Sequence, residues 1–299
     1  MSVKTLLLET RPQFLILSPI LALLGMSIAL YEGSFNALHF VLATIGLILL
    51  HISVNTLNDY SDFKTGIDLK VNRTPFSGGS GMLPSGALNE KTVLALGLGS
   101  FFLAVPIGIY FVIARGLALL PIFIAGAIFV LWYTSHITRL GLGAAEIAAG
   151  LGLGTLPVFG IFIIMNNGFS WSALYASVPS GFLVANLLLL NEFPDAEADR
   201  VGNRRTLPIT LGYRGAAIVY STLTLMTYIW ILAGVTLRLM PGWTLLGLLT
   251  LPFGLRAIKG SLTFNSLPEL IPAQGANVLT VLLTQLLIGI GFIIARIAQ

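Results

Sequence analysis

The chain has 299 residues, of which 56% are hydrophobic and only 9% are charged. A soluble domain of this length cannot cover so much apolar surface, so the composition predicts a polytopic membrane protein. Cysteine is absent, which excludes disulfides, cysteine-ligated zinc and thiolate catalysis. The net charge of +4 does not indicate a nucleic-acid-binding protein, because basic cytoplasmic loops also give a membrane protein a positive net charge.

Apolar windows of 18 or more residues predict nine membrane-spanning helices, so the expected fold is all-α. The predicted helices cover residues 12–31, 37–58, 92–114, 117–135, 143–165, 171–191, 215–237, 242–260 and 277–298. We treat residues 1–299 as one transmembrane domain. The first helix follows Lys4, Glu9 and Arg11 without a small-residue cleavage site, unlike a cleaved signal peptide.

Lysine and arginine fall almost entirely on one side of this topology. If the N-terminus is cytoplasmic, thirteen of the sixteen basic residues are cytoplasmic, and only Arg115, Arg238 and Arg296 lie on the far side. This positive-inside bias predicts a multi-pass integral membrane protein with a cytoplasmic N-terminus. We expect it in the plasma membrane of a prokaryote, with the lipid bilayer as its surroundings and no nucleic-acid partner.

Seven of the twelve carboxylates gather in or just after two stretches, residues 58–62 and 191–199. These stretches follow the second and the sixth predicted helix, so both face the cytoplasm. We expect Asp-rich loops at about 58–90 and 191–214. Their matching positions predict two four-helix units, helices 1–4 and 5–8, with one further helix, around a central cavity.

Like charge concentrated in this way repels itself unless a cation compensates it. Asp59 and Asp62 are three residues apart and Asp195 and Asp199 are four apart, so each pair shares one face if its helix continues. Such oxygens suit a hard cation such as Mg²⁺, which completes its shell with water and substrate phosphate. The alternative is that these carboxylates are solvated or pair with nearby lysines and arginines.

Asparagines accompany both acidic pairs. Asn58 and Asn191 precede them at helical spacing, so with the four aspartates they are candidate catalytic residues and metal ligands. His51, Asn55 and Asn58 continue toward Asp62 as one polar stripe. A polar stripe in an apolar span is typical of a helix that lines a cavity, so His51 and Asn55 are candidate substrate contacts.

Two tyrosines and one glutamate are further candidates. Tyr60 and Tyr133 lie near cytoplasmic helix ends, where a ring face could stabilise a carbocation or belong to an interfacial belt. Glu146 falls early in the fifth predicted helix. It is either a satisfied interfacial carboxylate or a group that orients an acceptor.

Each acidic stretch is followed by basic residues, Lys64 and Arg73 in the first case and Arg204 and Arg205 in the second. Cations beside metal-holding aspartates suit a diphosphate, because they neutralise charge that grows as this group leaves. The positive-inside bias alone would also place basic residues in these loops. Arg139, between the fourth and fifth helices, is a further candidate contact.

Glycine and serine fill most of residues 77–86. Backbone amides of such a segment can approach phosphate oxygens closely. Neither a Walker A nor a Rossmann spacing is present, so a nucleotide is not implied. A flexible lid or a simple linker would have the same composition.

These motifs resemble those of the UbiA superfamily of intramembrane prenyltransferases, over almost the whole chain. The resemblance is carried by Asn58-Asp59-x-x-Asp62-x-x-x-Gly66-x-Asp68 and by Asp195-x-x-x-Asp199, which runs on into Arg205-Thr206-Leu207. The segments similar to the 1,4-dihydroxy-2-naphthoate polyprenyltransferase branch include Gly66-Ile67-Asp68, Gly79-Ser80-Gly81 and Asn191-Glu192-Phe193-Pro194-Asp195.

The resemblance implies a prenyl diphosphate and an aromatic acceptor as substrates, with two Mg²⁺ ions between the four aspartates and the diphosphate. Arg73, Arg204 and Arg205 would contact the diphosphate, and Asp68 would be a further binding residue. In this branch, 1,4-dihydroxy-2-naphthoate attacks the allylic cation and loses CO₂, a step of menaquinone biosynthesis. Other members use 4-hydroxybenzoate, homogentisate or geranylgeranylglyceryl phosphate. A secondary transporter is the alternative from another class.

Overall fold

The computed structural model describes residues 2–299, and every regular element in that range is helical. The α-helices are α1 (Val3–Glu9), α2 (Pro12–Leu15), α3 (Leu17–Tyr31), α4 (Ala37–Thr65), α5 (Glu90–Arg115), α6 (Leu120–Trp132), α7 (Ala144–Gly150), α8 (Leu156–Asn166), α9 (Trp171–Val201), α10 (Leu207–Thr236), α11 (Leu251–Thr263) and α12 (Leu267–Ile297). The short turns between them are η1 (Ile67–Leu69), η2 (Leu117–Leu119), η3 (Ile137–Arg139), η4 (Leu151–Thr155) and η5 (Gly242–Thr250). The all-helical architecture predicted from the sequence is confirmed.

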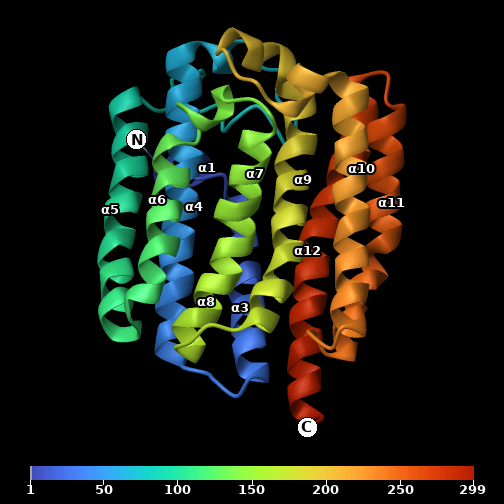
Figure 1. Cartoon of the computed structure of the whole chain (residues 1–299). Coiled ribbons are helices and arrows are strands. Elements are labelled where there is room, and N and C mark those ends of the chain that lie inside the picture. Colours follow the sequence, from blue (N-terminus) through green and yellow to red (C-terminus); the bar gives the residue numbers. More distant parts are fainter. Residues whose placement is uncertain (1) are drawn as a thin grey trace.

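The long helices stand side by side, and each connection joins neighbouring helix ends (Figure 1). Within residues 2–299, eight helical segments are long and apolar enough to cross a membrane. The shorter apolar segment Leu117–Trp132 stands where the fourth of the nine predicted helices was expected. The protein is therefore an integral, multi-pass membrane protein with eight long spans and one shorter apolar helix in the described chain.

The acidic stretches are helical, so the prediction of Asp-rich loops beginning at residues 58 and 191 is wrong. Helix α4 continues to Thr65 and α9 continues to Val201. The hydropathy windows placed the helix ends where charged residues begin. A helix can nevertheless continue through charged residues when their side chains have partners. The left-handed residue Gly66, with φ 78°, then ends α4.

Both acidic helix ends lie at the same end of the bundle, the upper end in Figure 1. The segment between α4 and α5 and the turn between α9 and α10 cross over this end (Figure 1). Helices α5 and α6 stand on one flank and α10 and α11 on the other, with α9 between them (Figure 1). The folding of the chain thus brings its two acidic stretches to one place.

Glycines allow two helical segments to approach closely beside this place. A Cβ atom on Gly150 would lie 2.6 Å from the carbonyl oxygen of Gly181, and one on Gly154 would lie 2.6 Å from that of Ser180. The Gly150-x-x-x-Gly154 spacing therefore serves close packing of two helical segments. This contact fixes η4 and the end of α7 against α9, which carries the second acidic stretch.

We predict that Gly154→Leu lowers the stability of the folded protein. The new side chain would collide with the backbone of α9, and overpacking of this kind costs about 1–3 kcal/mol. The apparent Tm in detergent should fall by about 5 °C or more. Gly99→Leu is the matched control, because a Cβ there has no heavy atom within 4 Å. Equal Tm values for the two variants would contradict the packing role.

Candidate active site

Five aspartates from three elements surround one polar pocket. Asp59 and Asp62 come from α4, Asp68 from η1, and Asp195 and Asp199 from α9. All but Asp195 are buried, and Asp195 is partly exposed. The pocket has a volume of about 190 Å³. Four of the aspartates line it, and the fifth, Asp59, contacts its rim through Arg11.

Two arginines neutralise these carboxylates. Arg204 forms ion pairs with Asp62 and with Asp199, the latter at 2.7 Å. Burial lowers the pKa of Arg204, but the neighbouring carboxylates of Asp62 and Asp199 outweigh this effect, so the pKa is raised overall. Arg204 therefore joins the first acidic stretch to the second.

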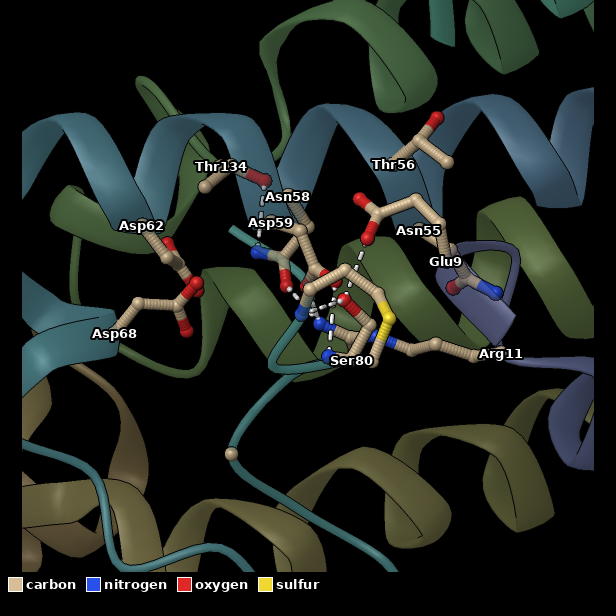
Figure 2. A network of polar contacts seen from close by, with 12 residues as sticks. Glu9, Arg11, Asn55, Thr56, Asn58, Asp59, Asp62, Asp68, Ser80 and Thr134 are labelled. Carbon is tan, nitrogen blue, oxygen red and sulfur yellow. Dashed lines mark hydrogen bonds and ion pairs between the residues drawn. The ribbon is translucent and has the colours of Figure 1, made fainter. Parts of the chain in front are cut away.

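Arg11 is the second of these arginines, and it was not among the predicted site residues. Its guanidinium pairs with Asp59 and lies 3.3 Å from the side-chain oxygen of Asn58 (Figure 2). Arg11 has a φ of 54°, a conformation uncommon for a residue with a side chain, immediately before Pro12. The only sequence signal was its position next to the first span.

The glycine-rich segment covers the pocket. The backbone amide of Gly78 donates to Asp195 at 3.2 Å, and that of Ser80 donates to Asp59 at 2.9 Å. Gly79 between them has φ 74°, and a Cβ there would lie 3.0 Å from Asp68 and 3.1 Å from Asp59. Glycine is needed at this position because the backbone passes so close to the carboxylates.

Glu9 holds this cover from the N-terminal side. Its carboxylate accepts a hydrogen bond of 2.6 Å from the hydroxyl of Ser80 (Figure 2). Glu9 is fully buried, and burial raises its pKa. The segment before the first span therefore supplies two contacts to the site, Glu9 to the cover and Arg11 to the acidic pocket.

The segment between α6 and α7 ties the two halves of the site together. Asn58 donates a hydrogen bond of 3.1 Å to the hydroxyl of Thr134 (Figure 2). The amide of Arg205 donates to the carbonyl of Thr138 at 2.8 Å. The amide of Leu207 donates to Glu146 at 2.7 Å. Glu146 therefore holds the turn that carries Arg204 and does not face the pocket.

The remaining predicted residues line the pocket, stand at its edge or lie elsewhere. His51, Asn55, Asn58 and Asn191 line the polar pocket. Arg73 stands at its edge, where it donates to the carbonyl of Asp68 at 3.1 Å. Four other predicted residues lie elsewhere. Tyr60 packs against the cluster of Leu83, Leu88 and Val93, and Lys64 pairs with Glu90 at 2.5 Å. Arg139 and Arg205 are exposed.

A second, larger cavity begins where the polar pocket ends. It has a volume of about 540 Å³, its walls are apolar, and it lies between α4, α5, α6, η4 and α8. His51, Asn55 and Asn58 line both spaces, and Tyr133 lines the apolar one. A ligand with a charged head and an apolar tail would fit this pair of cavities.

The chemistry of the pocket suits Mg²⁺. Among residues 2–299, no three acidic or histidine side chains already converge as a metal cluster. Mg²⁺ does not require such a cluster, because it commonly takes one or two carboxylates and completes its shell with water and phosphate. Within the described chain, Oδ2 of Asp68 and Oδ1 of Asp195 are buried and lack a hydrogen-bond partner. Hard oxygen donors are therefore available.

Comparisons with known proteins agree with this arrangement. Over 288 residues the chain is 27% identical to the 1,4-dihydroxy-2-naphthoate octaprenyltransferase of Bacillus subtilis, covering 96% of this chain and 91% of the relative. An apo UbiA homologue of Aeropyrum pernix superposes with a TM-score of 0.70 at 18% identity, covering 94% of this chain and 98% of that one.

A UbiA homologue of Archaeoglobus fulgidus bound to GPP and Mg²⁺ superposes with a TM-score of 0.63 at 15% identity. That match covers 97% of this chain and 99% of the other. The family of UbiA prenyltransferases matches residues 17–265. This chain belongs to the UbiA prenyltransferase family, and it is a membrane-embedded prenyltransferase.

Proposed function

We propose that the protein transfers a polyprenyl group from an allylic prenyl diphosphate to 1,4-dihydroxy-2-naphthoate, with loss of the acceptor carboxylate as CO₂. The observation that carries the proposal is the junction of a charged pocket with a long apolar cavity. The likeness to the Bacillus naphthoate enzyme supports this acceptor. The reaction would be a step of menaquinone biosynthesis.

The diphosphate would bind in the polar pocket. Arg204, Arg11 and Arg73 are the cations nearest to it, and they would form charge-assisted hydrogen bonds with phosphate oxygens. Asp59, Asp62, Asp195 and Asp199, with Asn58 and Asn191, would hold two Mg²⁺ ions. When bound, these ions supply positive charge that stabilises the departing diphosphate.

The bond between the prenyl C1 atom and the diphosphate oxygen would break, and its electron pair would leave with the diphosphate. The allylic cation would then lie near His51, Asn55 and Tyr133, at the mouth of the apolar cavity. The ring face of Tyr133 can stabilise such a cation. Tyr60 has no part in this proposal because it packs elsewhere.

An acceptor ring carbon would complete the reaction by donating an electron pair to the cation. The new carbon–carbon bond forms at the ring carbon that carries the carboxylate. The bond to that carboxylate then breaks, its electrons restore the aromatic ring, and CO₂ leaves. The surrounding apolar walls would exclude water, which would otherwise capture the cation.

We predict that Asp195→Asn reduces prenyl transfer by at least about 100-fold, because it removes a charged oxygen from the proposed metal and diphosphate site. Product formation from a labelled prenyl diphosphate in the presence of Mg²⁺ measures the loss. Glu197→Gln is the matched control, because the Glu197 side chain is 73% exposed and pairs with Arg200 on the outside of the same helix. Turnover of Asp195→Asn at the level of Glu197→Gln would contradict the metal assignment.

We predict a product lighter by CO₂ than the simple adduct when the purified protein receives 1,4-dihydroxy-2-naphthoate. Mass spectrometry of the product distinguishes the two. Parallel reactions contain 4-hydroxybenzoate, homogentisate or geranylgeranylglyceryl phosphate. Prenylation of one of these compounds, with none of the naphthoate, would retain the prenyltransferase reaction and overturn the proposed acceptor.

We propose that the site faces the cytoplasm of a prokaryotic cell, as the excess of basic residues at this end indicates. The natural absence of cysteine permits a direct test. We predict that Ala87→Cys, between α4 and α5, stays unlabelled by a membrane-impermeant maleimide in intact cells. Gly168→Cys, between α8 and α9 at the other end, should be labelled. After permeabilisation both should react, and the reverse pattern in intact cells would invert the topology.

A further inference from the structure

Apart from Gly152 in η4, the glycines that line the apolar cavity come from four different helices. They are Gly46 on α4, Gly108 on α5, Gly126 on α6 and Gly160 on α8, and we call them the glycine ring. Each lies six to nine residues from the helix end opposite the acidic pocket: Ala37 begins α4, Arg115 ends α5, Leu120 begins α6 and Asn166 ends α8. At 1.5 Å per residue, the four depths agree to within about one helical turn.

The glycine ring is not explained by tight helix packing. A Cβ atom on Gly46 or Gly160 would have its nearest neighbour at 3.4 Å, and one on Gly108 at 3.7 Å. A Cβ on Gly126 would have no heavy atom within 4 Å. A glycine inside a helix costs about 1 kcal/mol relative to alanine, and no close backbone contact demands it at Gly126. What these glycines do is keep the cavity open.

The depth of the glycine ring can be compared with the length of a prenyl tail. On α4, Gly46 lies five residues before His51 and nine before Asn55, so the glycine ring is about 8 to 14 Å from the proposed position of the allylic carbon. An extended isoprene unit adds four carbon–carbon bonds of about 1.5 Å, which is about 5 Å of length. A tail of one unit would therefore end before the glycine ring, whereas a tail of four units would extend past it.

Beyond the glycine ring, an aromatic and polar cluster borders part of the cavity. Phe111 lines the cavity and packs edge-on against His39, with ring centroids 5.6 Å apart. His39 is in turn hydrogen-bonded to Tyr110 at 3.0 Å and to Arg115 at 2.9 Å. A straight tail would meet this cluster.

A longer tail has one visible route outward. Ile109 on α5 and Ile124 on α6 line the cavity and are also 55% and 52% exposed on the outside of the bundle. The cavity thus opens toward lipid between these helices. A tail that extends past the glycine ring would turn here and continue in the bilayer.

We propose that the glycine ring determines the prenyl chain length that the protein accepts, and that it admits donors of four isoprene units or more. The inference rests on the proposed function, because it places the diphosphate in the acidic pocket. Gly126 is the position where the proposal is most directly tested. Gly126 lines the cavity, and a Cβ there would have no heavy atom within 4 Å, so there is room to add a side chain.

The experiment compares Gly126→Leu with the unchanged protein, using dimethylallyl and geranylgeranyl diphosphate as donors with one acceptor. We expect kcat/KM for the four-unit donor to fall at least tenfold and that for the one-unit donor to change less than twofold. The control is Gly99→Leu in α5, outside both cavities, where neither value should change. An equal fall for both donors, or no fall for the longer one, would overturn the inference.

A binding measurement separates this inference from the proposed function. Competition with a labelled prenyl diphosphate gives the affinity for each donor without any transfer step. A selective loss of affinity for the four-unit donor in Gly126→Leu would support the glycine ring even if no acceptor were prenylated. Equal affinities of both donors in the variant and the unchanged protein would refute the glycine ring, whatever the acceptor proves to be.

Discussion

The structure depends on the compensation of five carboxylates at one end of an apolar helix bundle. Unpaired buried charge is costly, and removing one partner of a buried pair typically costs about 3–5 kcal/mol. Arg204 compensates Asp62 and Asp199, while Arg11 compensates Asp59. Backbone amides of Gly78 and Ser80 complete the arrangement. Because the carboxylates and their partners come from separate segments, satisfying the charges also fixes where α4, α9, the N-terminal segment and the glycine-rich cover meet.

The same compensation prepares the site for its proposed substrates. Guanidinium groups bind carboxylates and phosphates with the same geometry, so Arg11 and Arg204 could exchange one anionic partner for another. Carboxylates released in this exchange would be free to bind cations. The net charge of the pocket then changes little, because the negative diphosphate and its positive metal ions enter together. An acidic, arginine-paired pocket is therefore consistent with a prenyl diphosphate site.

Much of this arrangement was predictable from the sequence, and the rest was not for physical reasons. Apolar windows located the helices, and helical spacing placed Asp59 with Asp62 and Asp195 with Asp199 at what proves to be one pocket. Hydropathy could not reveal that α4 and α9 continue through the charges, because that depends on distant arginines. Arg11 was missed for the same reason, since its partner is 48 residues away. Lys64 pairs with the nearby Glu90 and does not reach the pocket. The sign of its charge alone could not predict which carboxylate it would pair with.

The two cavities explain why the charged site lies at the edge of the apolar region and not in its middle. Ionisation of an allylic diphosphate needs strong charge compensation at the leaving group and a dry space for the cation. These requirements conflict within one small volume, because groups that stabilise a diphosphate also attract water. Here His51, Asn55 and Asn58 stand at the boundary between the two spaces. The bond that breaks would lie across this boundary, with the diphosphate on the charged side and the tail running past the glycine ring into apolar surroundings.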